Sequence, residues 1–417
     1  MKTQAAKTRT ADHLLPGQRT TRRRFLQATA AAAVATATIV PRHVLGGAAG
    51  PPPSEILGGA LIGCGGQGGG DFESLGRGAR RLATCDVKFK GKADDKTTYT
   101  DFRKVLERKD IDVVVIATPD HWHALISIAA AKAGKDIYCE KPMSLTIREA
   151  RAMVTAVRRY GRVFQTGSQQ RSSSEFRFAC EMVRSGRIGQ LKSIHVMVGG
   201  PSVECSEPAE PEPANVDWDM WLGPAPWRPY SKTVLGSWRP FIDYSGGQMT
   251  DWGAHHFDIA QWALDADNSG PLEIIPPGPD SEHLTYLYAN GVKVCRNPRA
   301  GAGVVFHGSE GTIMVDRGLL KTEPASIMRK PIGSNEVHLY DATRQGHGGN
   351  FIHCVRTRER PICDVEIGCR SVTVCHLGNI AYRLRRPLKW DPVKEKFPDD
   401  EEANRFLDRA KREPWTL

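Results

Sequence analysis

The segment GGQMTDWGAHHFDIAQWAL, residues 246–264, brings an acid and two histidines together at short spacing. Asp251 and His255 stand four residues apart, so they would share one face of a helix. A carboxylate beside an imidazole can orient the ring and hold its tautomer, which a base needs in order to take a proton from an alcohol. His255 or His256 alone is more often structural. The pairing with Asp251 behind a Gly-Gly turn is what favours a catalytic role.

The segment YCEKPMSL, residues 138–145, places a lysine between an acid and a proline, where an apolar run gives way to a helical pattern. Pro142 lacks a backbone donor and restricts Lys141 to extended backbone, so the lysine is predicted to stand on a stiff, non-helical turn. The alternative is a surface salt bridge of Glu140 with a neighbour, which leaves the position of the turn unexplained.

A nucleotide site is predicted in ALIGCGGQGGGDF, where Gly63, Gly65, Gly66, Gln67 and Gly68 form a G-x-G-x-x-G turn directly after an apolar run. The glycines permit a tight turn and close approach to a pyrophosphate, which meets the N-terminus of the next helix. The next apolar run ends at Asp86, which would accept hydrogen bonds from a ribose 2′-hydroxyl and favours NAD. Lys88 and Lys90 could instead neutralise a 2′-phosphate, which leaves NADP open. A glycine turn without a nucleotide is the alternative.

The patterns around these segments predict two folded parts. Up to about residue 170, continuous apolar runs alternate with helical segments, which predicts an α/β fold with a doubly wound parallel sheet of the Rossmann type. Beyond it, shorter strands joined by turn residues predict an α+β domain with a large, mostly antiparallel sheet. The predicted strands of this second part are LKSIHVMVGG, LTYLYANGVKVC, AGVVFHGSEGTIMVD and AYRLRRPLKW. The predicted domains are residues 51–170 for the nucleotide and 171–417 for substrate and oligomerisation.

The N-terminal segment TRRRFLQATAAAAVATATIVP resembles a twin-arginine export signal. Its apolar stretch is shorter than the ~20 residues that a membrane span needs, so the mature protein is not expected to cross a membrane. Residues 1–50 hold eight Lys and Arg against Asp12, which accounts for +7 of the net charge of +10 and leaves no basic excess that would favour nucleic acid. We expect a signal peptide and linker over residues 1–50, engagement of the twin-arginine translocation machinery, and a periplasmic or secreted protein. A basic tail is the alternative.

The ten cysteines are scattered, with neither a C-x-x-C pair nor a cluster with histidine. Neither a metal site nor a disulfide framework is therefore predicted.

With Gly63–Gly68, TPDHWH at 118–123, CEKP at 139–142 and DWGAHHFD at 251–258 in this order, the chain closely resembles the Gfo/Idh/MocA oxidoreductases. This family includes glucose-fructose oxidoreductases and inositol dehydrogenases, and the resemblance runs from about residue 56 to the C-terminus. It implies that Lys141 bridges the nicotinamide ribose and the reacting hydroxyl. It implies that His255 is the general base, and that Asp251 binds the hydroxyl or orients His255. Further implied positions are Glu140 and Pro142 at the lysine turn, and Thr118, Pro119 and His123 beside the nicotinamide.

The predicted function is an NAD(P)-dependent oxidoreductase that transfers hydride to or from a secondary alcohol of a sugar, sugar derivative or cyclitol. A tightly bound nucleotide is expected because free NAD is scarce outside the cytoplasm, and a homo-oligomer is expected by family analogy. Gln169 and His256 are the predicted substrate contacts, from a wider set that includes Arg171, Trp238, Arg239 and Tyr244. Two alternatives stay open: a redox-neutral, glycosidase-like enzyme that oxidises its sugar transiently, and a non-catalytic nucleotide-binding sensor.

Overall fold

The computed structural model describes residues 55–279 and 281–417, and the predicted export signal lies outside them. The folded unit begins at Glu55 and ends at Leu417. Because both predicted domains belong to this one unit, the boundary near residue 170 stays a prediction.

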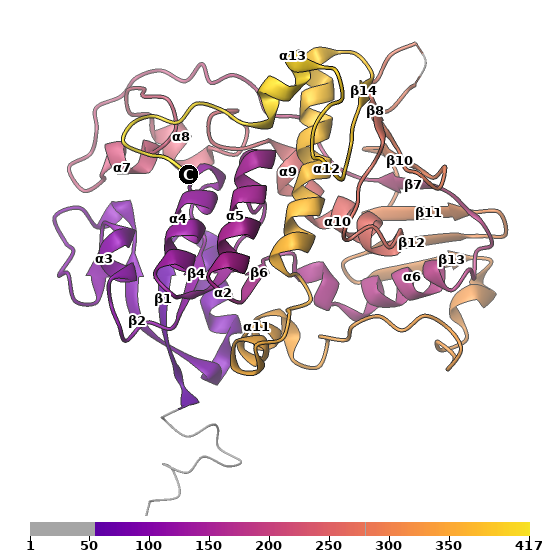
Figure 1. Cartoon of the computed structure of the whole chain (residues 1–417), viewed down its shortest axis with the longest axis horizontal. Helices are drawn as coiled ribbons and strands as arrows, with labels where there is room; N and C mark the ends of the chain where they lie inside the picture. The colour runs from indigo at the N-terminus through magenta and orange to yellow at the C-terminus, as the bar shows by residue number, and fades with distance from the viewer. Residues whose placement is uncertain (1–54, 280) are drawn as a thin grey trace, which may run out of the picture. The chain divides into compact units, whose positions relative to one another are not determined.

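A six-stranded parallel sheet forms the first part, in the strand order β3-β2-β1-β4-β5-β6 (Figure 1). This is the strand order of a doubly wound Rossmann fold, which confirms the prediction. Its strands are β1 (Leu57–Ile62), β2 (Ala79–Cys85), β3 (Thr98–Tyr99), β4 (Val113–Ile116), β5 (Asp136–Cys139) and β6 (Phe164–Thr166). The helices within this part are α2 (Gly66–Ser74), α3 (Phe102–Leu106), α4 (Asp120–Lys132) and α5 (Ile147–Arg159).

Strand β4 shows why the apolar runs are continuous. Val114 and Ile116 belong to the apolar cluster on one face of the sheet, and Val113 and Val115 belong to the cluster on the other. A central parallel strand covered by helices on both faces needs apolar residues at every position.

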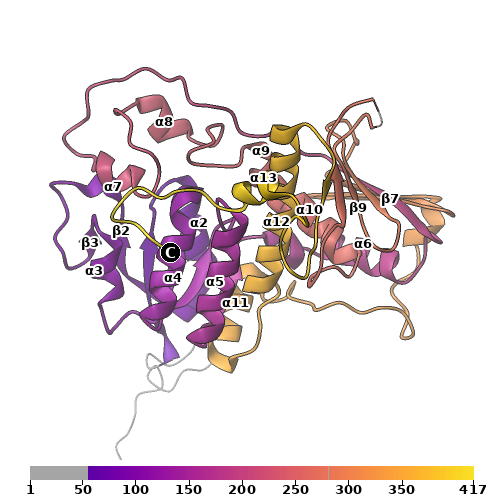
Figure 2. The same ribbon diagram turned by 45° about the horizontal axis from the view of Figure 1, so that its top comes forward.

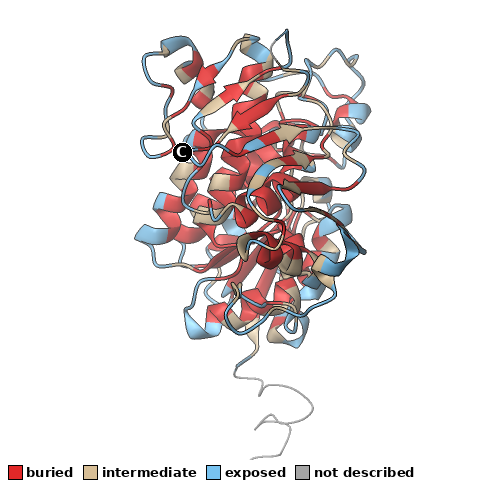
Figure 3. Cartoon of the chain, turned by 90° about the vertical axis from the view of Figure 1, so that its right-hand side faces the viewer, coloured by how far each residue is buried: buried red, intermediate tan, exposed pale blue. Residues whose placement is uncertain are grey.

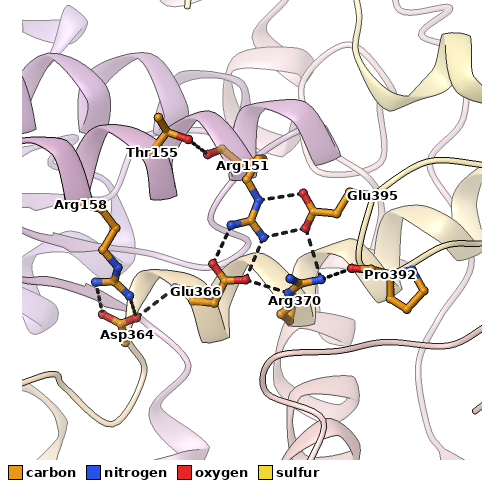
Figure 4. A network of polar contacts seen from close by, with 8 residues as sticks. All are labelled: Arg151, Thr155, Arg158, Asp364, Glu366, Arg370, Pro392 and Glu395. Carbon is orange, nitrogen blue, oxygen red and sulfur yellow. Dashed lines mark hydrogen bonds and ion pairs between the residues drawn. The ribbon is translucent and has the colours of Figure 1, made fainter. Parts of the chain in front are cut away.

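Two late helices return to this first sheet. They are α11 (Gly346–Thr357), whose Phe351 packs on one face, and α12 (Val365–Leu384), whose Val372 packs on the other. Arg151 of α5 makes ion pairs of 2.6 Å with Glu366 of α12 and with Glu395 (Figure 4). The C-terminal part of the chain therefore completes the packing of the first sheet.

An eight-stranded sheet forms the second part, in the order β13-β12-β11-β7-β10-β9-β8-β14. All neighbouring pairs are antiparallel except β7 with β10, so the predicted mostly antiparallel sheet is confirmed. Its strands are β7 (Leu191–Val196), β8 (Glu273–Ile275), β9 (Thr285–Leu287), β10 (Lys293–Arg296), β11 (Val304–Gly308), β12 (Thr312–Asp316), β13 (Leu319–Glu323) and β14 (Leu388–Lys389). The remaining helices are α6 (Ser174–Arg184), α7 (Trp218–Leu222), α8 (Lys232–Ser237), α9 (Gln248–Asp251), α10 (Gly253–Ala263) and α13 (Glu401–Asn404).

The largest apolar cluster lies between this sheet and its helices. Ile194 and Val196 of β7 pack in the same cluster as Phe176 of α6 and Phe257 of α10. Figure 3 shows the buried residues concentrated in the strands and in the helix faces beside them.

Two local features differ from a regular alternating pattern. The predicted strand AYRLRRPLKW is wrong for its first half, because α12 continues to Leu384 and only Leu388–Lys389 pairs as β14. Helix-forming residues extend α12 until Arg385 adopts a left-handed conformation, with φ of 53°. The short segment after Asp86 holds a single 3₁₀ turn, Val87–Phe89, in place of a crossover helix.

Within the described ranges, none of the helices is both long and apolar enough to cross a lipid bilayer.

Candidate active site

A cavity of about 610 Å³ opens where the carboxyl ends of β1, β2, β4 and β5 meet residues of the second part. Its lining comes from the glycine turn after β1, the turn after β5, the segment around α9 and α10, and the β12–β13 turn. The crevice beyond the carboxyl ends of the strands is where doubly wound sheets bind nucleotides. Gly63, Lys141, Asp251 and His255, predicted from separate motifs, all line this one cavity.

The glycine turn is tight but leaves open space at its middle residues, because a Cβ on Gly65 or Gly66 would meet nothing within 4 Å. Gly63 has a φ of +87°, and a Cβ there would lie 2.6 Å from the Ala117 backbone. A Cβ on Gly68 would lie 2.5 Å from the Gly63 carbonyl oxygen, so the turn packs directly against the helix that follows it. Helix α2 begins at Gly66, and its N-cap residue, Gly65, has no capping side chain. Its first N–H groups are thus available to an anion.

Asp86 lines the cavity at the end of β2. Its carboxylate accepts hydrogen bonds from the backbone N–H groups of Cys64, at 2.8 Å, and Lys88, at 2.9 Å. The acid predicted to bind a ribose therefore stands directly beside the glycine turn. Lys88 and Lys90 were the two residues that could bind the 2′-phosphate of NADP. Lys88 lines the cavity, whereas Lys90 forms an ion pair with Glu212.

Thr118 and Pro119 line the cavity as predicted, and the Thr118 hydroxyl is buried without a hydrogen-bond partner among the described residues. His123 does not line it. Its Nδ1 lies 2.7 Å from the Pro142 carbonyl oxygen and its Nε2 lies 2.8 Å from that of Thr118. Burial lowers the pKa of His123 to about 4, so the ring is neutral and donates to only one of the two. His123 therefore braces the turn that carries Lys141.

Lys141 and Asp251 form the central contact of the cavity, although 110 residues separate them in the chain. The Lys141 Nζ donates to Asp251 Oδ1 at 2.6 Å, and both side chains are largely shielded from solvent. Asp251 stands at the last residue of α9, where it can reach across to the turn after β5. The partner of Asp251 is thus Lys141 and not His255, so the predicted orientation of His255 by Asp251 does not occur here.

His255 is held instead by Arg317, in the turn between β12 and β13. Arg317 Nη2 lies 3.2 Å from His255 Nε2, and the buried Nδ1 has no partner among the described residues. Burial, together with the positive charges of Lys141 and Arg317, lowers the pKa of His255 well below its usual range. The ring is therefore neutral, with its Nε2 lone pair facing a donor, which is the protonation state a general base needs.

Two buried carboxyls stand close to the lysine. Burial raises the pKa of Glu140 to about 8, and burial likewise raises that of Asp120, at the start of α4, to about 8. Gln169 donates from Nε2 to Glu140 Oε1 at 3.0 Å, and all three residues line the cavity. Both acids are thus largely protonated at neutral pH and add little negative charge to the site.

Several predicted residues lie elsewhere. His256 is absent from the cavity lining, and its Nδ1 lies 2.8 Å from the Met197 carbonyl oxygen. Arg171 is fully buried and binds Asp258 at 2.7 Å, which ties the segment after β6 to α10. Of the wider set, Trp238 and Arg239 line the cavity, and Tyr244 packs in a separate aromatic cluster.

Sequence reasoning missed two groups at the cavity. Asp120 directly follows Thr118 and Pro119, so the TPDHWH motif contained a usable signal. Arg317 stands in an ordinary strand turn, VDRGLL, which carries no catalytic pattern. Its place beside His255 follows only from packing of the second sheet against α10.

No cluster of three or more candidate metal ligands occurs in residues 55–279 or 281–417.

Two family models match the chain. Residues 202–417 match the C-terminal alpha/beta domain of the Gfo/Idh/MocA oxidoreductases, and residues 76–168 match their NAD-binding Rossmann fold. The first match alone covers more than half of the chain.

Two of the curated relatives are a sugar dehydrogenase and a cyclitol dehydrogenase by name. Levoglucosan dehydrogenase of Pseudarthrobacter phenanthrenivorans is 30% identical over 259 residues, which are 61% of this chain and 55% of that protein. The match therefore spans about half the length of that relative. The scyllo-inositol 2-dehydrogenase (NAD(+)) of Bacillus subtilis is 27% identical over 310 residues, which are 69% of this chain and 80% of that protein.

Solved structures share the fold. An oxidoreductase domain protein from Kribbella flavida superposes with a TM-score of 0.57 at 21% identity, covering 80% of this chain and 99% of that chain. A levoglucosan dehydrogenase in complex with NADH and L-sorbose gives the same TM-score, identity and coverage.

Proposed function

The chain belongs to the Gfo/Idh/MocA oxidoreductase family, and from this premise we propose that it is an NAD-dependent dehydrogenase or reductase acting on a secondary alcohol or ketone of a sugar, sugar derivative or cyclitol. One observation carries the proposal: the open glycine turn, the Lys141–Asp251 pair and the neutral His255 line a single cavity. The activities named for the relatives agree with it.

The residues present fit a nicotinamide dinucleotide. The uncapped N-terminus of α2 faces a cavity that Asp86 also lines, and the Thr118 hydroxyl is an unpartnered buried group at the same place. Gly65, Gly66, Gln67, Asp86, Thr118 and Pro119 would hold the dinucleotide, with Glu140 and Lys141 at its reactive end. When bound, the nicotinamide ring supplies the acceptor or donor of the hydride.

The side chains then divide the remaining chemistry. His255 would accept the hydroxyl proton at Nε2. This nitrogen carries the lone pair of the neutral ring, and the lone pair becomes free once Arg317 moves aside. The Lys141 ammonium would stabilise negative charge on the same oxygen. Asp251 would hold the Lys141 side chain in place through the 2.6 Å contact, which assigns it the role of orienting the lysine and not the histidine.

We also propose that the nucleotide is tightly bound, because the segment between β7 and α9 covers the cavity. In both Figure 1 and Figure 2, α7 and α8 of this segment lie above α3 and α4. Trp221, Leu235 and Trp238 of this cover line the cavity. Its anchors include the Trp221 carbonyl oxygen, which lies 2.9 Å from His121 Nε2 and accepts from Trp122 Nε1 at 3.0 Å. Release of the nucleotide would require this packed segment to open.

The decisive experiment is to purify the full chain, denature it and identify the released nucleotide. Recovery of NAD is expected. Recovery of NADP would overturn the reading of Asp86, and recovery of none would overturn tight binding. Turnover of sugars and cyclitols, followed by mass spectrometry, then tests the reaction. Release of a substituent without net oxidation would replace the dehydrogenase proposal with the redox-neutral alternative. Full turnover by Lys141→Ala would exclude the catalytic mechanism proposed here.

Export and assembly are separate proposals. We propose export through the twin-arginine machinery on the strength of the N-terminal motif alone, and fractionation of cells expressing wild type and an Arg22→Lys, Arg23→Lys variant tests it. Wild type in the periplasm or medium, with the variant retained inside, is expected. Homo-oligomer formation is proposed by family analogy, and light scattering tests it.

A further inference from the structure

The part of the cavity around His255 carries more positive than negative charge. Lys141, Arg239 and Arg317 all line it, and the carboxylate that faces them is that of Asp251. Asp251 Oδ1 lies 2.6 Å from Lys141 Nζ and 3.5 Å from Arg239 Nε, so two positively charged side chains share one carboxylate as their ion-pair partner. Arg317 forms no ion pair with any described residue within 4.0 Å.

The other acids of the cavity do not offset this charge. Asp86, directly after β2, accepts hydrogen bonds from the backbone N–H groups of Cys64 and Lys88 beside the glycine turn. Burial raises the pKa of both Asp120 and Glu140 to about 8, so both are mostly neutral at pH 7. The excess of positive charge therefore stays with the region where a substrate would meet His255.

Both arginines are held in the same way, with the guanidinium against a tryptophan ring. Arg239 Cζ lies 4.6 Å from the ring centroid of Trp238, and Arg317 Cζ lies 5.1 Å from that of Trp252. Stacking occupies the face of a guanidinium and leaves the N–H groups along its edge free. The one side-chain hydrogen bond of Arg317 goes to His255, and Arg239 has its long contact with Asp251. Two guanidinium groups thus stand at the cavity with most of their N–H donors unused by the described residues, and such a group can bind a carboxylate through two parallel hydrogen bonds.

We propose that the substrate is a sugar acid and that its carboxylate is bound by Arg317, with Arg239 contributing. The proposal rests on the proposed function, because it names the substrate class of the same site. Arg317 lies 3.2 Å from the proposed base, so the anion it binds must sit close to the reacting carbon. A carboxylate attached directly to the carbon chain of a sugar meets this condition.

The same contact couples recognition to the chemistry. With no substrate present, Arg317 donates to His255 Nε2 and occupies the lone pair that the base requires. A carboxylate would draw these N–H groups away and free that lone pair. A neutral sugar has no group that competes equally well for a guanidinium.

Binding of sugar acids and their neutral counterparts to the NADH-loaded full chain tests the proposal. The probes are D-glucuronate against D-glucose, D-galacturonate against D-galactose, and D-gluconate against D-glucitol, titrated by calorimetry. For at least one pair the acid is expected to bind about 10- to 100-fold more tightly than its neutral counterpart, the range of a charge-assisted hydrogen bond. Arg317→Gln should remove most of this preference, because it should weaken binding of the acid far more than binding of the neutral sugar. Arg239→Gln should reduce the preference in part.

Arg383→Gln is the matched control, because it removes the same charge from an arginine outside this cavity. The Cζ of Arg383 lies 4.8 Å from the ring centroid of Phe406. It should preserve the preference. Equal affinity for acid and neutral sugar in every pair, no binding of any acid, or equal weakening of both by Arg317→Gln would overturn the proposal. Binding is measured separately from turnover. Bound acids without any oxidation would therefore count against the proposed function alone, and oxidation restricted to neutral sugars would count against the sugar acid alone.

Discussion

Asp120→Asn should stabilise the protein at neutral pH, although Asp120 belongs to the candidate active site. The carboxyl is 2% exposed and burial raises its pKa from 3.8 to about 8, while a hydrogen bond with Ser245 and the charge of Lys141 oppose that rise. In the unfolded chain Asp120 is ionised at pH 7, so folding must return a proton to it. That costs about 4 kcal/mol at 1.36 kcal/mol per pKa unit.

The sign of the pH dependence follows from the raised pKa. At pH 3 Asp120 is mostly protonated whether the chain is folded or unfolded, so replacing it with a neutral amide gains little. As pH rises from 4 towards 8, the unfolded chain loses its proton while the folded protein retains it, and wild type becomes progressively less stable. The Asp120→Asn variant would avoid this loss, because its amide does not titrate. The stability that Asp120→Asn gains over wild type is thus small near pH 4 and reaches its full size near pH 8.

Thermal unfolding of the nucleotide-free protein at pH 4, 6 and 8 measures the effect. For a folded unit of this size, about 4 kcal/mol corresponds to a rise in Tm of roughly 5 °C. Asp399→Asn is the matched control, because Asp399 is exposed and has a left-handed backbone that asparagine tolerates. Its effect on Tm should be small at each pH, because an exposed side chain makes few contacts in the folded protein. A gain from Asp120→Asn that is equal at pH 4 and pH 8, or a loss of stability at pH 8, would refute the reasoning.

Three further changes test the site and its support. Lys141→Met should lower kcat by about 10²- to 10³-fold with the nucleotide still bound, because the variant lacks one group that stabilises the developing oxyanion. Rapid-mixing kinetics would measure this loss of rate. Loss of the bound nucleotide from the variant would contradict the prediction. The kcat/KM for alcohol oxidation should stay level as pH falls through 6.5, because burial lowers the pKa of His255; a decline centred at 6.5 would speak against His255 as the base. Arg171→Met should cost about 3–5 kcal/mol, because it removes the ion-pair partner of the fully buried Asp258, and adding Asp258→Asn should recover most of the loss in Tm.

Much of the fold could be predicted from local patterns. The runs that became β1, β2, β4 and β5 are largely apolar, and β4 is apolar at every position, which only a strand covered on both faces requires. The end of α12 was misread because AYRLRRPLKW combines helix formers with apolar residues, and short apolar segments do not distinguish helix from strand. The return of α11 and α12 to the first sheet left no local signal, since their apolar residues would suit either sheet.

For the candidate site, the sequence by itself determined the backbone chemistry: the glycine turn, the acid at the end of β2 and the stiff turn that carries Lys141. These features act over a few residues, so residue type and spacing are enough to specify them. The tertiary structure alone decided which side chains meet. It paired Asp251 with Lys141 instead of His255, set Arg317 beside His255, and left His256 out of the cavity. Such contacts join residues far apart in the chain, and they depend on how two sheets and their helices pack, which no short spacing records.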